Sequence, residues 1–266
     1  MLLKNTCDFT DFFYEDVEAV INVYPLSDLI TKTSKSYSIK ETWSALIDKL
    51  VKTIDVKNIK LNTKVTHVVK KDNIFSLKTN DNQIYQSKKL ILCGDLDITK
   101  IQFSGINGIN DFYNNNIGSI HFIRIYTYHD KVDIKNNIRT TSPLNKIIPI
   151  SKNIVMAAYA DNDNATFLYD LVKKLNKEDL QKYIGKMLNK SLLEGDSVTD
   201  IKDFMIRYWS NGIHYYKPGY NINQDKLVEQ GVLVCGEAVS QRQGWCEGAF
   251  QNVDDSKNLF EKLIKQ

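Results

Sequence analysis

The sequence predicts an α/β fold, or an α+β fold with a mixed sheet, and two observations lead to that prediction. Stretches in which apolar residues recur every three or four positions alternate along the chain with β-rich stretches bounded by polar turns. Apolar residues fill 42% of the 266 positions, which is enough to bury a substantial core. Such alternation is typical of layered proteins in which helices cover a sheet.

The first third of the chain predicts helices and then strands. Residues 9–24 have the apolar spacing of a helix. Ser38 and Glu41 have the spacing of a capping box, and a helix with apolar positions at Trp43, Leu46, Ile47 and Leu50 is expected to follow. The next stretch predicts strands separated by Lys-Asp-Asn and Asn-Asp-Asn turns, ending in Leu90–Cys93, whose uninterrupted apolar run favours a strand covered on both faces.

The remaining two thirds continue the alternation. Two β-rich stretches are followed by two helices, of which the second begins after the capping residue Asn176. An aromatic stretch then leads to an apolar strand, a glycine-rich turn and a helix that starts near Glu247 and runs to the end. These segments are the β-rich residues 119–131 and 147–161, the helices 165–175 and 177–193, the aromatic residues 208–220 and the strand 231–235.

Charge and hydropathy exclude several classes of protein. Thirty-five basic side chains against 32 acidic ones leave a net charge of +3, too small to predict a nucleic-acid partner. No apolar run reaches the ~18 residues of a membrane span. Asp8 and Asp11 interrupt the start of the chain, so we expect no targeting peptide and a cytoplasmic location. Heavy use of Lys, Asn and Ile is typical of an AT-rich genome, and for a viral protein association with the virion is a further expectation.

Cysteine and histidine provide no metal or disulfide motif. No Cys-x-x-Cys pair occurs, and no two histidines stand four residues apart as on one helix face. The cysteines are therefore predicted to be buried, reduced thiols. The residues concerned are Cys7, Cys93, Cys235, Cys246, His67, His121, His129 and His214.

The strongest chemical signal lies between the last strand and the last helix. The apolar strand runs into Gly236 and Glu237, a polar loop follows, and a helix begins among Gly244 and Gly248. The unpaired amides and positive dipole of a helix start suit a phosphate or an electron-rich ring edge, and glycines let a ligand approach the backbone. The same pattern also serves as a tight connection, so both interpretations remain open.

In detail, Cys-Gly-Glu-Ala and Gly-Trp-Cys-Glu-Gly-Ala resemble the C-terminal flavin-binding motif of the flavin-containing amine oxidase family, which includes monoamine and polyamine oxidases. That motif reads as a strand, Ala-Gly-Glu followed by Ala or Thr, a loop, and Gly-x-x-Glu-Gly-Ala at a helix start. Residues 36–70 and 87–98 are similar to a helix and strands of the family, and Arg207-Tyr-Trp with residues 214–218 resembles its aromatic wall.

The resemblance implies an FAD cofactor, a small amine substrate and a set of site residues. Backbone groups of the glycine-rich turn would contact the flavin, and the aromatic side chains would flank its ring and the substrate cavity. For Trp209 and the two tyrosines, plain core packing is the alternative. The implied cofactor-binding residues are Val65, Trp209, Gly236, Glu237, Gly244, Trp245, Cys246, Gly248 and Ala249, and the implied pocket residues are Tyr215 and Tyr216.

Two features of the family pattern are missing from these residues. The G-x-G-x-x-G fingerprint, which holds the FAD pyrophosphate at a helix N-terminus, does not occur, and Gly105-Ile-Asn-Gly108 lacks its spacing. The lysine that many members place near the flavin would fall within residues 119–128, which contain none. Arg124 stands there, but arginine stays protonated and is a poor base, so a surface or salt-bridged Arg124 is expected. No catalytic residue is assigned.

Two functions therefore remain. One is FAD-dependent oxidation of an amine, with the missing nucleotide-binding half supplied by another chain. The other is a non-catalytic amine-oxidase-like module for structure or interaction in a larger assembly. Residues 37–99 and 226–266 would form the remnant of an FAD-binding lobe, and residues 1–36 and 100–225 a substrate-side lobe. Apolar surface at the place of the missing half predicts a partner chain or a homo-oligomer.

Overall fold

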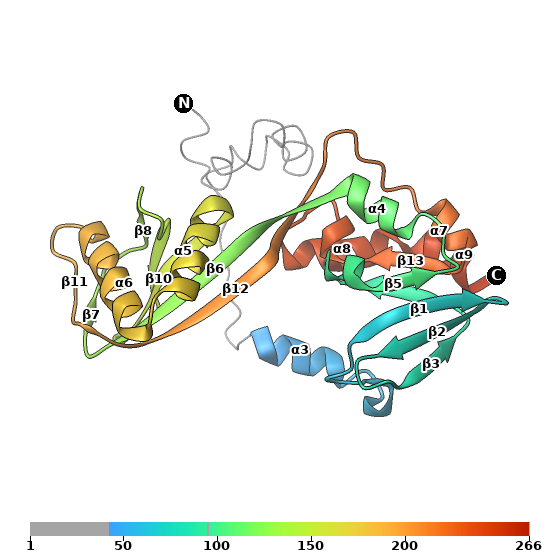
Figure 1. Cartoon of the computed structure of the whole chain (residues 1–266), viewed down its shortest axis with the longest axis horizontal. Coiled ribbons are helices and arrows are strands. Elements are labelled where there is room, and N and C mark those ends of the chain that lie inside the picture. Colours follow the sequence, from blue (N-terminus) through green and yellow to red (C-terminus); the bar gives the residue numbers. More distant parts are fainter. Residues whose placement is uncertain (1–42, 95, 266) are drawn as a thin grey trace.

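The computed structural model describes residues 43–94 and 96–265, which form two bodies joined by two long strands (Figure 1). The long strands are β6 (Ile117–His129) and β12 (Ile201–Tyr216), and they pair antiparallel from end to end. Helices, parallel strand pairs and antiparallel sheets all occur, so the predicted mixed α/β class is confirmed.

A four-stranded sheet lies in the right-hand body of Figure 1. Its strands are β1 (Val65–Lys71), β2 (Ile74–Thr79), β3 (Ile84–Ser87) and β5 (Gln102–Ser104), in the order β3-β2-β1-β5. The first three form the predicted antiparallel series, whereas β5 runs parallel to β1. Asp72 and Asn73, with φ values of 48° and 61°, turn the chain between β1 and β2, since Asp and Asn tolerate this region better than other non-glycine residues.

A parallel strand pair forms the second sheet of this body. β4 (Leu90–Cys93) and β13 (Val232–Cys235) run in register, with Cys93 opposite Cys235. β13 is buried at every position. The prediction that β4 is covered on both faces is wrong: alternate residues are exposed, Ile91 to 41%, because the described residues leave that face open.

Helices pack around these two sheets. Buried residues of β1, β2, β4 and β13 share one core with the side chains of a helix that follows β5. The single helix predicted from Glu247 onward is two helices instead, with Ser256 between them, and Asp254 and Asp255 stand at the end of the first one, where acidic side chains are unfavourable. The helices are α3 (Trp43–Val51), η3 (Val56–Asn58), η4 (Leu96–Lys100), α4 (Ile109–Asn116), α7 (Asp225–Glu229), η5 (Glu237–Val239), α8 (Cys246–Asp255) and α9 (Lys257–Lys265).

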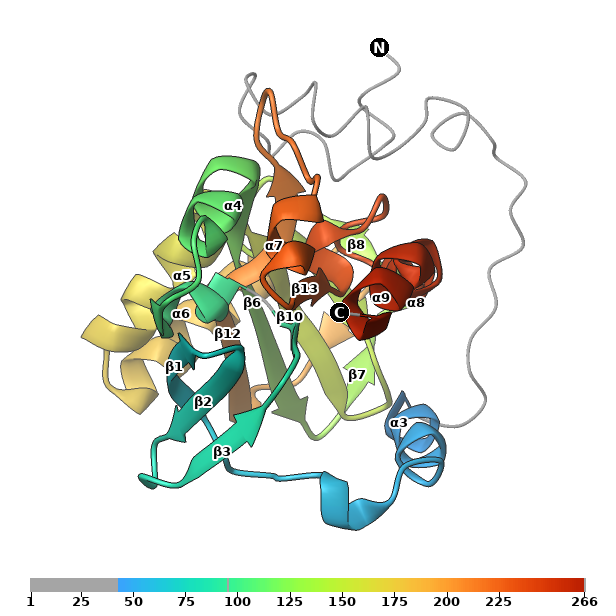
Figure 2. The same ribbon diagram turned by 90° about the vertical axis from the view of Figure 1, so that its right-hand side faces the viewer.

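A five-stranded antiparallel sheet, with two helices on one face, forms the left-hand body. Figure 2 views the molecule from the other end, with this sheet behind β1, β2 and β3. The strand order is β12-β6-β10-β9-β8, and β7 pairs separately with β11. The further elements are β7 (Val132–Asp133), β8 (Ile138–Arg139), β9 (Lys146–Pro149), β10 (Ile154–Asp161), α5 (Asn162–Lys174), α6 (Lys177–Ser191) and β11 (Ser197–Val198).

The local sequence signals of this body are confirmed where the structure describes them. The side chain of Asn176 accepts a hydrogen bond from the amide of Asp179 at 2.9 Å, which is the predicted cap of α6. Outside this body, the helix expected from Trp43 is also present. The predicted helix at 9–24 and the capping box that begins at Ser38 lie outside the described residues.

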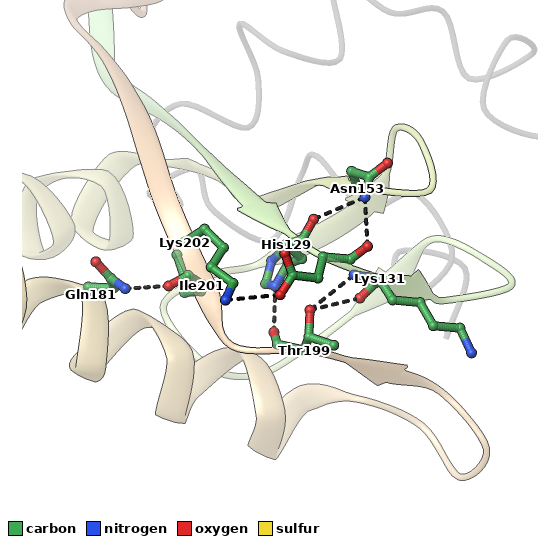
Figure 3. A network of polar contacts seen from close by, with 8 residues as sticks. His129, Lys131, Asn153, Gln181, Thr199, Ile201 and Lys202 are labelled. Carbon is green, nitrogen blue, oxygen red and sulfur yellow. Dashed lines mark hydrogen bonds and ion pairs between the residues drawn. The ribbon is translucent and has the colours of Figure 1, made fainter.

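A polar network holds the far end of the long strands (Figure 3). The Nδ1 atom of the buried His129 donates to the carbonyl of Thr199 at 2.6 Å, and its Nε2 atom lies 2.9 Å from the hydroxyl of Thr127. The amide of Lys131 donates to the Thr199 hydroxyl at 3.0 Å, and the side-chain amide of Asn153 donates to the carbonyl of His129 at 3.1 Å. These bonds fix where β6 ends and β12 begins.

Gln224 closes the outer edge of β13. The amide of Leu90 donates to the carbonyl of Gly231 at 3.0 Å. In a parallel pair only alternate residues of a strand bond to a given neighbour, so the backbone groups of Val234 point away from β4. The buried Gln224 side chain accepts from the Val234 amide at 2.7 Å and donates to the Val234 carbonyl at 2.9 Å. A side-chain amide thus takes the place of a neighbouring strand.

We predict that Gln224→Leu destabilises the protein by about 2–4 kcal/mol, because it leaves two buried backbone groups without partners. Gln86→Leu is the control, since Gln86 is exposed on β3 and its replacement should change stability by less than about 0.5 kcal/mol. Urea unfolding of both variants measures the difference. Equal losses would show that Gln224 does not close the strand edge.

Candidate functional site

The turn after β13 begins at a glycine with a backbone that other residues rarely adopt. Gly236 has a φ of 114°, and a Cβ atom built there would meet nothing within 4 Å. The amide of Gly236 donates to the side-chain oxygen of Asn252 at 2.9 Å, and the side-chain nitrogen of Asn252 donates to the carbonyl of Val239 at 3.0 Å. One asparagine of α8 therefore holds both ends of η5.

The carboxylate of Glu237 joins the turn to the long strand β12. One oxygen lies 2.6 Å from Nδ1 of His214, and the other accepts a hydrogen bond from the amide of Gly244. Because a carboxylate only accepts, Nδ1 carries the proton. His214 is 6% exposed, and its Nε2 atom is buried with no hydrogen-bond partner among the described residues.

The second glycine of the turn is required by packing. A Cβ atom at Gly248 would stand 2.1 Å from the carbonyl oxygen of Arg242 and 2.5 Å from the hydroxyl of Ser240. Gly248 thus lets the start of α8 lie directly against the loop. The other predicted residues of this turn remain near the surface: Trp245 and Cys246 are exposed, and Ala249 is half-buried.

Aromatic rings surround Arg124 on the face of the five-stranded sheet opposite α5 and α6. The guanidinium carbon lies 5.2 Å from the ring centre of Phe122, 5.1 Å from that of Tyr159 and 5.9 Å from that of Trp209. Its Nε atom is buried without a partner, and no carboxylate among the described residues pairs with it. The expected surface or salt-bridged Arg124 is thus corrected: aromatic faces, which attract cations, hold this charge instead.

The two tyrosines predicted for a pocket occupy different environments. Tyr215 lies against Gly118, where its ring takes the space a Cβ would need, and it lines a polar pocket of about 380 Å³ with Asn211 and Lys217. Tyr216 is fully buried and stacks on Tyr220 with 4.2 Å between ring centres. Burial raises the pKa of Tyr216.

The structure brings only part of the predicted set together. Gly236, Glu237, Gly244 and Gly248 meet in one turn. Trp209 lies on β12, beside the ring of Phe122, and Val65 begins β1 in the four-stranded sheet. The aromatic side chains and Val65 thus come from sheets other than the one that ends in the turn.

Sequence reasoning missed the two side chains that build the turn. The sequence places His214 among residues 214–218, which resemble an aromatic wall, and a lone histidine on an aromatic strand gives no local signal for a carboxylate partner. Asn252 is a polar residue on the buried side of a helix, which is unusual enough to indicate a backbone contact. A single sequence cannot show which backbone groups it meets.

Within the part of the chain that the structure describes, no group of three or more His, Cys, Asp or Glu side chains could hold a metal ion. None of the described helices combines the length and apolar character needed to cross a membrane.

The antiparallel strand series, the parallel strand pair and the separate helix-covered sheet together make a mixed α/β fold. The chain belongs to the flavin-containing amine oxidoreductase family, whose model matches residues 6–252. The predicted resemblance to this family is thereby confirmed. A comparison with curated proteins returns no match.

Two solved structures have the same fold at low sequence identity. Cyclohexylamine oxidase from Brevibacterium oxydans IH-35A superposes with a TM-score of 0.63 at 11% identity, over 84% of this chain and 52% of that chain. A protein assigned as a protoporphyrinogen oxidase from Exiguobacterium sp. 255-15 has a TM-score of 0.61 at 13% identity, over 97% of this chain and 58% of that one. The chain spans little more than half the length of either.

Family membership implies FAD, and three features of the turn fit the polar part of a flavin. The buried Nε2 atom of His214 lacks a partner within the described chain, and open space faces Gly236. Helix α8 starts without a side-chain cap, so its first amides have no side-chain acceptor. The lysine that many members carry is absent from β6.

We predict that Glu237→Ala lowers stability by about 2–4 kcal/mol, because it removes two hydrogen bonds to a charged acceptor. Hydrogen exchange at the Gly244 amide should accelerate in the same variant. Glu247→Ala is the matched control from the same motif: Glu247 is exposed, and its loss should cost no more than about 1 kcal/mol. Equal effects in urea unfolding would contradict the assigned role of Glu237.

Proposed function

We propose that this chain is the C-terminal part of an FAD-dependent amine oxidase system. The observation that carries the proposal is the turn between β13 and α8, where Glu237 binds His214 and Gly244 and leaves Gly236 open. A flavin edge rich in carbonyls and hydroxyls matches backbone amides at a helix start. When bound, FAD supplies the hydride acceptor for oxidation of an amine.

The open face of the five-stranded sheet supports an amine substrate in its neutral form. Trp209, Phe122 and Tyr159 provide apolar surface against which a bound substrate would exclude water. Arg124 stays protonated among these rings, so a protonated amine would meet a like charge. A neutral amine avoids this repulsion. Tyr215 lines a separate polar pocket, which would suit a polar end of the substrate.

A partner chain would supply the part of the FAD site that these residues lack. The sequence contains no G-x-G-x-x-G fingerprint for the pyrophosphate. Four large apolar side chains of α8 and α9 are 42–60% exposed, which is more than a closed lobe leaves to water. They are Phe250, Val253, Phe260 and Ile264. We propose that the dinucleotide-binding partner covers them.

One observation favours the alternative, a non-catalytic module. The outer edge of β13 is where a further strand would extend the sheet, yet Gln224 satisfies Val234 there and Asn252 satisfies Gly236. A partner strand would have to displace both side chains. If the edge stays closed, the fold serves assembly and binds no dinucleotide.

The oxidase would contain bound flavin, which absorbs visible light, and the non-catalytic module would not. The first experiment is therefore an absorbance spectrum of protein purified from its native source. We expect the two bands of oxidised flavin between ~300 and ~550 nm, in stoichiometric amount. A spectrum that stays flat after excess FAD is added would refute the oxidase and leave the module.

A glycine variant tests the turn itself. We predict that Gly236→Ala weakens FAD binding about tenfold or more, equal to ~1.4 kcal/mol, because its methyl group enters the space that the flavin needs. Gly195→Ala is the matched control: Gly195 also has a positive φ, of 84°, with nothing within 4 Å of an added Cβ, but lies between α6 and β11. Fluorescence titration with FAD compares them, and equal affinities would argue against flavin at this turn.

A further inference from the structure

Two cysteines stand opposite each other at the ends of the parallel strands. Cys93 is the last residue of β4 and Cys235 the last of β13, and they are register partners. Neighbouring strands lie ~4.8 Å apart, and register partners of a parallel pair project to the same face. Disulfides join Cα atoms about 4.4–6.8 Å apart. The two thiols, which are free in this structure, are therefore within reach of a disulfide.

The surroundings give the two thiols different chemistry. The prediction of buried thiols is confirmed for Cys235, which is 7% exposed and packs against Leu263 of α9, and is wrong for Cys93 and Cys246, which are exposed. A hydrogen bond from Cys235 stabilises the thiolate of Cys93 and lowers its pKa from 9.0 to about 7. The same hydrogen bond, together with burial, raises the pKa of Cys235. Cys93 is thus an accessible nucleophile with a protonated thiol directly beside it.

Among the residues that the structure describes, Tyr113 is a further titratable group that interacts electrostatically with both thiols. Tyr113 of α4 is buried, and desolvation raises its pKa, so its phenol is neutral at neutral pH. It neither donates a permanent charge nor competes for an oxidant. The acidity of Cys93 therefore depends on Cys235.

We propose that Cys93 and Cys235 form a reversible redox couple, which a hydroperoxide oxidises to a disulfide that joins β4 to β13. Cys235 directly precedes Gly236 of the proposed flavin turn, but neither step uses a flavin. The redox couple can therefore be tested separately from the proposed function. A disulfide here would fix the spacing of the two strand ends just before Gly94 and Gly236.

Oxidation proceeds in two balanced steps. The Cys93 thiolate attacks an oxygen of the hydroperoxide: an S–O bond forms, the O–O bond breaks, and the leaving oxygen takes up a proton as an alcohol, or as water from hydrogen peroxide. Cys93 is then a sulfenic acid. The sulfur of Cys235 attacks the sulfur of Cys93, an S–S bond forms, the S–O bond breaks, and the leaving hydroxide takes the thiol proton of Cys235 as water. Two thiols have lost two electrons and two protons.

The test uses the full chain with Cys7→Ser and Cys246→Ser, which leaves only this pair of thiols. Equimolar hydrogen peroxide should remove both thiols, lower the mass by two hydrogen atoms, and link the tryptic peptides 90–100 and 227–242. Dithiothreitol should restore both thiols. Thermal unfolding before treatment checks that the variant is folded.

Single replacements separate the roles of the two thiols. In Cys235→Ser the sulfenic acid of Cys93 should persist and react with dimedone, whereas in Cys93→Ser the buried Cys235 should remain unoxidised. Cys235→Ala should also raise the pH at which Cys93 reacts half-maximally with bromobimane from about 7 toward 9.0, because it removes the hydrogen-bond donor.

The proposal is overturned if peroxide drives Cys93 to sulfinic acid without linking the two peptides. It is also overturned if the disulfide joins two copies of the chain, which a non-reducing gel would reveal. A flavin-free chain that forms the disulfide supports the redox couple even if the proposed oxidase function fails.

Discussion

The carboxylate of Glu237 is the contact on which the C-terminal turn depends. Its two oxygens bind groups from separate parts of the chain, the imidazole of His214 on β12 and the amide of Gly244 in the loop. His214 is buried, so the carboxylate gives a polar ring its only described partner there. The turn, the long strand and the start of α8 are thereby held in one arrangement, which is what a cofactor site requires.

The long strands transmit that arrangement to the second body. β12 carries His214 near one end, Trp209 beside Arg124 further along, and Ile201 beside the His129 network at the other end. The residue that contacts the turn, His214, and the aromatic face at Trp209 therefore lie on the same strand. The pairing of β12 with β6 shifts register between Trp209 and Ile213, and the part of the pair beyond this irregularity buries one face beneath α5 and α6. The fold thus places an apolar, cation-bearing wall at a fixed position relative to the turn.

Local patterns predicted most elements of the fold, while contacts between distant residues escaped prediction. The cap at Asn176 and the polar turns of β1 to β3 depend on neighbours in sequence, so the chain reveals them. Whether β4 is covered on both faces depends on which distant residues pack over Ile91, and in the structure none covers it fully. The hydrogen-bond partner of Glu237 is His214, which lies 23 residues away in sequence. Both Cys93 and Cys235 end an apolar run and precede a glycine, a repeated signal that indicates equivalent strand ends but not their adjacency.

The central claim is that the turn from Gly236 to Ala249 receives the flavin, and hydrogen exchange tests it most directly. The protein, with its native partner, is compared with and without saturating FAD by peptide-level mass spectrometry. We expect slower exchange in residues 236–249, where amides gain acceptors, and unchanged exchange in α6, which lies in the other body. Unchanged exchange across 236–249, with FAD demonstrably bound, would contradict it.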